Sequence, residues 1–157
     1  MTWEQVLANP FLQNLPFKIE LISFGQVLMS PVSNQHKIIQ SDVGYELRRH
    51  KYNGRVINGC SIRTSDGVRV ADIAWASEDF LAVYGEQTPY PQAPEICVEI
   101  VSPSNAKLEV KNRIELYLEQ GALEVWIVNS KKQVSFFSRH GKLSKSKLLP
   151  KLKLLPE

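Results

Sequence analysis

Two acidic side chains, Asp72 and Glu99, lie inside runs of residues that otherwise have the character of core β-strands. Burying an unpaired charge is so costly that each carboxylate must find a partner or become neutral. One interpretation is structural: each acid bonds a basic side chain or a backbone N–H. In the other, both acids converge on one divalent cation, because hard cations such as Mg²⁺ prefer carboxylate and carbonyl oxygens. The residues alone leave both interpretations open.

The segments around the two acids indicate how their strands are arranged. Glu99 lies in a nearly continuous apolar run at 95–101, which is typical of a strand buried on both faces. A helix is expected from about 106 to 120, and another apolar strand follows at 123–128. Such a strand–helix–strand crossover makes its two strands parallel. If the strand of Asp72 pairs beside that of Glu99, one ion can reach both carboxylates.

The remaining elements alternate between helices and paired strands. Helices are expected at 3–8, 34–51 and 77–84, and strands at 17–23, 26–29, 55–63, 68–75 and 133–138, with a last edge strand over 148–155. This order predicts an α/β fold of the mixed α+β kind. Its centre is a mixed β-sheet that carries antiparallel hairpin strands and is flanked by helices.

Length and composition are those of one globular domain over residues 1–157. The chain is 43% apolar and 22% charged, which excludes a disordered chain, a collagen-like repeat and a coiled coil. No apolar run approaches the roughly 20 residues that span a bilayer, and Glu4 stands where a signal peptide has positive charge. We therefore expect a cytoplasmic protein without membrane contact. Cys60 and Cys97 are too few for a disulfide framework and are expected to be reduced core residues.

Positive charge is concentrated at the end of the chain. Residues 131–157 carry eight Lys or Arg and one acid, whereas residues 1–130 carry eleven basic and fifteen acidic side chains. A polyanion such as nucleic acid could dock on the basic segment. The alternative is an edge strand that its lysines protect from aggregation.

Five short motifs within residues 17–139 occur in an order that resembles one known family. They are Ile19-Glu20-Leu21-Ile22 followed by Gly25, Met29-Ser30-Pro31 followed by His36, Val70–Trp75, Val98–Ser104, and Tyr117 followed by Gly121-Ala122 and Glu124–Val128. On these motifs the chain resembles the Uma family of restriction-endonuclease-like proteins, which is assigned to the PD-(D/E)XK nuclease superfamily. The resemblance covers most of the chain.

This resemblance implies a restriction-endonuclease-like fold in which Asp72 and Glu99 lie on adjacent core strands and bind Mg²⁺ or Mn²⁺. The backbone carbonyl of Ile100 would be a third ligand. Glu20 matches an early family glutamate that binds metal directly or through water. The implied reaction is metal-assisted hydrolysis of DNA phosphodiester bonds, in which the ion stabilises the pentacoordinate phosphate and lowers the pKa of the attacking water. His36 matches a family histidine, for which a structural role and contact with phosphate are both open.

The chain departs from the family pattern at the motif lysine. Val101 occupies the lysine position of the D/E-x-K motif, where the family is usually apolar, and the family's lysine on the next helix corresponds to Arg113. Arginine keeps the charge but does not act as a base, because its pKa stays above about 12. Lys111 and Arg113 flank opposite edges of the helix's apolar stripe, so only one faces the site. The alignment with the family's helical lysine favours Arg113 as a catalytic cation. The alternative, in which Lys111 and Arg113 both lie on a solvated flank of the helix, explains the two side chains equally well.

Three functions from different classes remain compatible with these residues. The first is a Mg²⁺-dependent endodeoxyribonuclease, and the second is an inactive nuclease-fold module that binds nucleic acid or a protein partner. The third is a structural homo-oligomer built through sheet edges. A homodimer is compatible with the first, since nucleases that cut both strands commonly relate two sites by a twofold axis.

Overall fold

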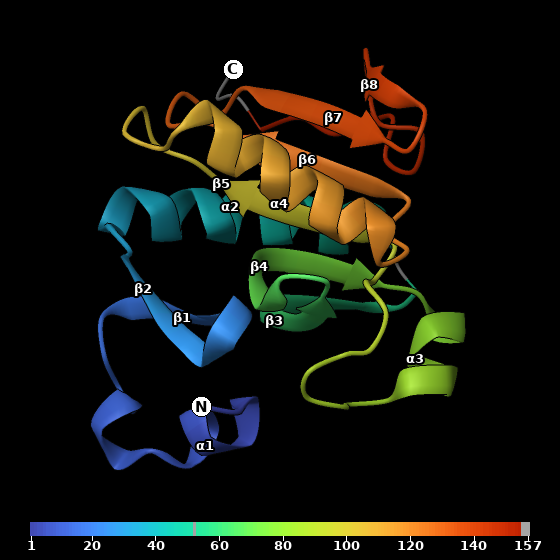
Figure 1. Ribbon diagram of the computed structural model, residues 1–157. Helices are drawn as coiled ribbons and strands as arrows, with labels where there is room; N and C mark the ends of the chain where they lie inside the picture. The colour runs from blue at the N-terminus through green and yellow to red at the C-terminus, as the bar shows by residue number, and fades with distance from the viewer. Residues whose placement is uncertain (52, 155–157) are drawn as a thin grey trace.

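The computed structural model describes residues 1–51 and 53–154. In this part of the chain, eight strands form one sheet in the order β2-β1-β4-β5-β6-β7-β8, with β3 paired to β4 off this path (Figure 1). The strands are β1 (Phe17–Ile22), β2 (Gln26–Pro31), β3 (Arg55–Thr64), β4 (Gly67–Ala76), β5 (Ile96–Ile100), β6 (Glu124–Val128), β7 (Val134–Ser138) and β8 (Gly141–Leu143). The helices are α1 (Trp3–Ala8), α2 (Asn34–His50), α3 (Glu78–Tyr84) and α4 (Lys107–Glu119), with short 3₁₀ turns at η1 (Pro10–Leu12) and η2 (Ser23–Gly25).

The sheet is mixed, as the sequence predicts. β5 and β6 run parallel and are joined by the crossover helix α4. The hairpins β1–β2, β3–β4 and β6–β7 are antiparallel, and so is the pairing of β4 with β5. The predicted α/β class with a central sheet and flanking hairpins is therefore confirmed.

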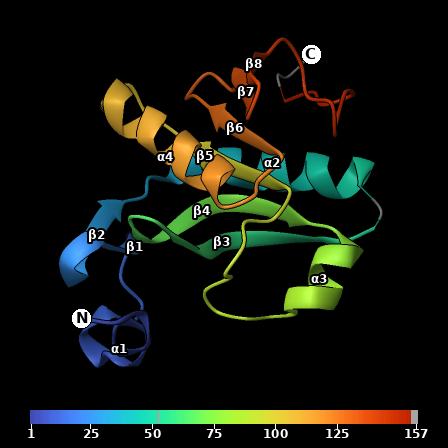
Figure 2. The same ribbon diagram turned by 45° about the vertical axis from the view of Figure 1, so that its right-hand side comes forward.

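Helices cover both faces of the centre of the sheet. In Figures 1 and 2, α4 lies over one side of β5 and β6, while α2 lies on the other side. The face under α4 is closed by an apolar cluster that includes Ile114, Tyr117, Cys97 and Val125. The opposite face is closed by Val43 and other apolar residues of α2 against the sheet. β5 and β6 are thus buried on both faces, which explains why their sequences are apolar except for Glu99 and Glu124.

Local capping determines where the helix beside the site begins. The Ser33 side chain accepts a hydrogen bond from the His36 N–H and so caps the N-terminus of α2. This start places His36 in the first turn of the helix. By contrast, α4 begins at Lys107 without a side-chain cap, because its N-cap residue Ala106 has no side-chain acceptor. The Asn105 side chain accepts a bond of 2.7 Å from the Ser102 N–H within the preceding loop.

The predicted edge strand over 148–155 is wrong for the residues that the structure describes, and residue 155 lies outside them. The last described strand is β8, which pairs with β7. The buried Glu124 carboxylate accepts hydrogen bonds from the N–H groups of Lys147 and Leu148, so these groups are not available to a β-ladder. The leucines that follow pack on the apolar cluster of the α2 face instead.

Two smaller expectations concern the cysteines and the membrane. Cys60 and Cys97 are free and buried, as predicted for core residues. Within residues 1–51 and 53–154, no helix combines the length and the apolar character that crossing a bilayer requires.

Candidate functional site

Asp72 in β4 and Glu99 in β5 lie next to each other on neighbouring strands. The antiparallel register pairs Ile73 with Val98, and one further step along both strands brings Asp72 opposite Glu99. Residues directly opposite in an antiparallel pair project from the same face of the sheet. Both side chains are buried, with 4% of each exposed. The two acids therefore meet inside the sheet, as both the structural and the metal interpretation require.

Lys18 in β1 lies between the two acids. Its Nζ is 3.2 Å from Asp72 Oδ1 and 2.8 Å from Glu99 Oε2, and its side chain is 12% exposed. One cationic atom therefore contacts one oxygen from each acid. In this state the ammonium compensates the buried charge of the pair.

The other oxygens of the two acids are held by neutral donors and by Arg113. Asp72 Oδ2 accepts a hydrogen bond of 2.8 Å from the Ile100 N–H. Glu99 Oε1 accepts a bond of 2.6 Å from the Tyr117 hydroxyl and lies 3.4 Å from Arg113 Nη1. Each carboxylate is thus fixed by one oxygen to the protein, while its second oxygen faces Lys18.

Arg113 is fully engaged by glutamates. Its Nη1 and Nη2 donate to the two oxygens of Glu20 at 2.8 and 2.6 Å, and its Nε donates to Glu109 at 2.5 Å. Glu20 is completely buried and also accepts a bond from the Val70 N–H. Arg113 thus faces the site, but its donors are committed to these acids. Both oxygens of Glu20 in turn face Arg113, whereas Asp72 and Glu99 each present one oxygen to Lys18.

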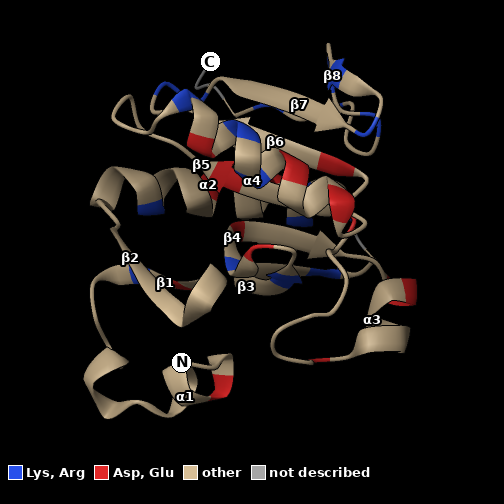
Figure 3. Cartoon of the chain, in the orientation of Figure 1, with Lys and Arg blue, Asp and Glu red and all other residues tan. Residues whose placement is uncertain are grey.

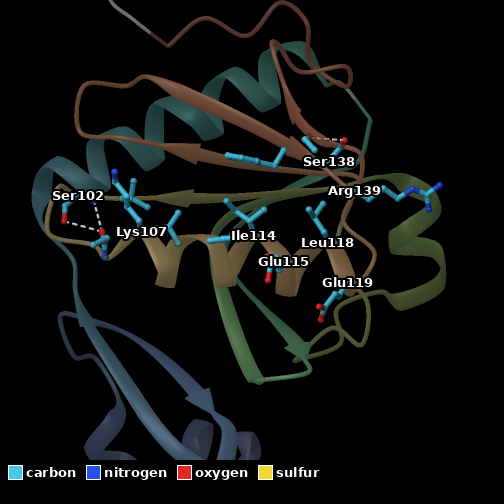
Figure 4. Close-up of a pocket in the computed structure, with 14 residues that line it drawn as sticks. Ser102, Lys107, Ile114, Glu115, Leu118, Glu119, Ser138 and Arg139 are labelled. Atoms are coloured by element: carbon cyan, nitrogen blue, oxygen red, sulfur yellow. Dashed lines mark hydrogen bonds between the residues drawn. The ribbon is translucent and has the colours of Figure 1, made fainter.

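Lys111 is not brought to the acids. It lines a separate cavity of about 830 Å³ together with apolar residues of α4 and β7 (Figure 4). Of Lys111 and Arg113, only one turns toward the site, as the helical wheel predicts, and it is Arg113, which the family register favours. The solvated-flank interpretation fails for Arg113, which is 7% exposed.

The acids open into a polar cleft of about 660 Å³. Asp72, Glu99 and Lys18 line it together with His36, whose Nε2 is 3.3 Å from Asp72 Oδ1. Hydroxyl and amide side chains from the end of β2, the start of α2 and the β5–α4 loop complete the lining, among them Ser30, Ser33, Gln35, Ser102, Ser104 and Asn105. A polar ligand can therefore reach the acid pair.

Burial and neighbouring charges determine how these groups ionise. Burial raises the pKa of Glu99 to about 7, against the opposing effect of the Lys18 ammonium. Burial also acts to raise the pKa of Asp72, but Lys18 and His36 outweigh it and hold that pKa well below its usual range. Burial likewise opposes the charge on Lys18, yet Glu99 and Asp72 keep the Lys18 pKa above its ordinary value. Asp72 and Lys18 are therefore charged at neutral pH, while Glu99 titrates there.

The comparisons with known proteins bear on this site. The model of the Uma2 family, described as "Putative restriction endonuclease", matches residues 3–155. The chain belongs to the Uma2 family. A crystal structure of a "putative nuclease belonging to DUF820" from Anabaena variabilis has the same fold, with a TM-score of 0.63 and 18% identity, over 86% of this chain and 73% of that one. None of the curated proteins matches the chain. The predicted resemblance to the Uma family is thus confirmed.

Restriction-endonuclease-like proteins generally use divalent metals. We therefore ask whether the side chains of this cleft could bind a hard divalent cation. Among the described residues, no group of three or more His, Cys, Asp or Glu is arranged to hold a metal. The smaller set, Asp72 Oδ1 and Glu99 Oε2, does converge on one cationic atom. Carboxylate oxygens are the donors that Mg²⁺ and Mn²⁺ prefer, and Mg²⁺ usually keeps several waters beside one or two carboxylates. The donor set therefore fits such an ion, provided that Lys18 gives way.

Lys18 and Tyr117 were not singled out by the sequence analysis as groups that contact the acids. A signal for Lys18 exists, because residues two apart in a strand share a face and Lys18 precedes Glu20 by two. Tyr117 was assigned to the buried stripe of α4, where it lies. Helical periodicity places such a residue on the inner face but does not show what its hydroxyl bonds.

Proposed function

We propose that this chain is a Mg²⁺- or Mn²⁺-dependent endonuclease that hydrolyses DNA phosphodiester bonds. The observation that carries the proposal is the convergence of Asp72 Oδ1 and Glu99 Oε2 on one cation at the floor of a polar cleft. The nuclease description of the Uma2 family supports the choice of reaction.

Asp72 and Glu99 would hold the metal ion, with the main chain at Ile100 beside them. When bound, such an ion polarises the phosphate and lowers the pKa of a coordinated water. The buried groups leave room for this charge, because Glu20, Asp72 and Glu99 carry three negative charges when ionised while Lys18 and Arg113 carry two positive ones. With all three acids ionised, these five groups carry a net charge of −1, which a bound cation would offset.

The other residues of the site position the acids and the substrate. Tyr117 and Arg113 fix Glu99 Oε1, so that Glu99 Oε2 faces the cleft. Glu20 Oε1 accepts a hydrogen bond from Arg113 Nη2 and so fixes the guanidinium. We therefore assign Glu20 a positioning role rather than direct contact with metal. His36 lines the cleft beside Asp72 and is suited to contact a phosphate oxygen.

The test is nicking of supercoiled plasmid DNA by the purified protein with Mg²⁺ or Mn²⁺. We expect Asp72→Asn and Glu99→Gln to lower the rate on the order of 100-fold or more, since each removes a carboxylate that would hold the ion, and the ion stabilises the developing phosphate charge. Glu78→Gln, an acid-to-amide change at an exposed residue of α3 outside the cleft, serves as the control and should retain the rate. Undiminished nicking by both acid variants would contradict the proposal.

An inactive module that binds nucleic acid or protein is the second candidate, and one observation favours it. Lys18 already compensates the acid pair without any metal, as in a site that has lost its chemistry. This candidate predicts salt-sensitive DNA binding without cleavage. The free, buried cysteines favour a reducing compartment, so for either function we propose a cytoplasmic location.

We further propose that two copies associate through the groove between α4 and β7, which Figure 4 shows. Its floor is apolar, with Val110, Ile114, Leu118 and Phe137. Its lining also includes two lysines followed by two glutamates, spaced four residues apart on α4: Lys107, Lys111, Glu115 and Glu119. Figure 3 shows that basic and acidic residues both occur along this helix. Two copies of α4 packed antiparallel about a twofold axis would set lysines against glutamates. The mixed signs suit a second copy better than a polyanion.

A further inference from the structure

Lys18 contacts the same two oxygens that a metal ion would use. Its Nζ lies 3.2 Å from Asp72 Oδ1 and 2.8 Å from Glu99 Oε2. The side chain comes from β1, a strand that carries neither of these acids, and reaches them from the wall of the cleft. An ammonium and a divalent ion cannot both occupy the space between these two oxygens.

The remaining oxygens of the pair offer the ion no alternative position. Asp72 Oδ2 is bonded to the Ile100 N–H, while Glu99 Oε1 is bonded to the Tyr117 hydroxyl and lies near the Arg113 guanidinium. Releasing these bonds would leave buried donors unpaired, which is costly. Releasing Lys18 costs less, since its long stem can carry the ammonium into the adjoining cleft, where water solvates it.

We propose that Lys18 is a built-in counter-ion that a divalent cation displaces, so that ion uptake and release of the ammonium into the cleft are one event. The inference rests on the proposed metal centre of the nuclease and adds to it a competitor on β1. After release, the ammonium faces the part of the cleft lined by His36 and Ser30, where a phosphate group of the substrate would lie. Lys18 thus compensates the acids before the ion binds and faces the substrate afterwards.

A purely structural counter-ion would behave differently. Removing it would destabilise the fold and would strengthen ion binding only through the loss of a nearby positive charge. In wild type, such an ammonium would also stay on the acids when the ion binds. Displacement requires that loss of the ammonium strengthen ion binding, since the ion then enters without expelling a charge from the same oxygens.

The test compares wild type with Lys18→Met, using Lys145→Met as the lysine control, because Lys145 is exposed and lines neither the cleft nor the groove. Binding of Mn²⁺ is measured by calorimetry, and the melting temperature is measured with and without Mn²⁺. We expect Lys18→Met to melt at a lower temperature than wild type without the ion, to show a larger rise in melting temperature with Mn²⁺, and to bind Mn²⁺ at least about tenfold more tightly. Lys145→Met should match wild type in all three measurements.

A second measurement needs no variant at Lys18. Reductive methylation of wild type, read by mass spectrometry, should label Lys18 faster when Mn²⁺ is present, while labelling of Lys111 stays unchanged. If wild type binds Mn²⁺ but Lys18→Met binds it with the same affinity, the exchange is overturned. The exchange is also overturned if wild type binds Mn²⁺ and labelling of Lys18 is not faster. Neither result overturns the proposed metal centre. Uptake by neither protein overturns both the exchange and the proposed metal centre.

Discussion

Arg113 contacts three glutamates at once, and this commits its charge to the structure of the site. Both oxygens of Glu20 bind it, and Glu20 has no solvent exposure. Bidentate pairing of this kind suits the planar guanidinium and not the point charge of lysine. The arginine at the position of the family's helical lysine therefore holds acids in place, while Lys18 supplies the cation that faces the cleft.

Arg113→Met should destabilise the protein by about 3 kcal/mol, because it leaves the buried charge of Glu20 unpaired. Adding Glu20→Gln should recover much of this loss, since the double variant removes both charges. Urea unfolding measures both effects. Lys111→Met, on the outer edge of the same helix, should remain within about 0.5 kcal/mol of wild type. Additive losses in the double variant would show that the pair is not coupled.

Glu99 gives the stability of the protein a pH dependence. Its pKa is raised to about 7 in the folded chain from an ordinary value of 4.5, so the folded state favours the protonated acid. The stabilisation is fully present below 4.5 and is lost as the pH rises through 7. We expect the stability difference between wild type and Glu99→Gln to fall across this window and then level off. Chemical unfolding at several pH values measures it, with the exposed Leu108→Ala as a control that should parallel wild type. A constant difference would contradict the raised pKa.

At the scale of elements, the segment after β8 shows how hydrogen bonds to one buried carboxylate can take the place of strand pairing. Glu124, the first residue of β6, accepts hydrogen bonds from the Ser146 hydroxyl and from two backbone N–H groups of the tail. Glu46 on α2 accepts another from the Lys153 N–H. The tail is therefore fixed across the α2 face by carboxylates, and its leucines complete that face of the core.

Glu124→Gln should loosen this tail without unfolding the sheet. Hydrogen bonds to a charged acceptor contribute about 1.5–3 kcal/mol each, so their weakening should speed hydrogen exchange at Lys147 and Leu148 by about tenfold or more. Exchange at the β5 amides should not change. The exposed Glu119→Gln provides the control. Equal acceleration at Leu148 and in β5 would point to global destabilisation instead.

At the scale of the whole molecule, α4 separates two surfaces of different character. One side of the helix contributes Arg113 to the polar cleft and the buried Tyr117 hydroxyl to Glu99. The other side lines the apolar groove, with two lysines followed by two glutamates. The groove and the cleft adjoin at Val101, Ser102 and Asn105, which line both, so a twofold pairing through the groove would bring the partner close to each cleft. Two sites related by symmetry suit cleavage of both strands of a duplex.

The charge pattern of the groove predicts the behaviour of charge-reversal variants. Antiparallel pairing sets Lys111 of one copy against Glu115 of the other, so Lys111→Glu should weaken the dimer on the order of tenfold by like-charge contact. The double variant Lys111→Glu/Glu115→Lys restores the complementarity and should recover the dimer. Sedimentation velocity over a range of concentrations measures this. A wild-type chain that is monomeric throughout would exclude the interface.

Most of the fold followed from the sequence, because hydrophobic periodicity and turn residues are local signals. The apolar run around Glu99 and the crossover helix identified the central strands, and the family motifs directed attention to Asp72 and Glu99. The wheel of α4 showed that Arg113 and Lys111 face opposite sides. These features depend on residues near one another in the chain.

Only the tertiary structure decided which charges neutralise one another. Lys18 is 54 residues from Asp72 and 81 from Glu99, and no local pattern expresses such a contact. The tail was misassigned for the same reason, since its apolar alternation suits a strand but the buried Glu124 takes its N–H groups. A buried charge selects its partner by distance in space, and that distance is set by strand order and register across the whole sheet.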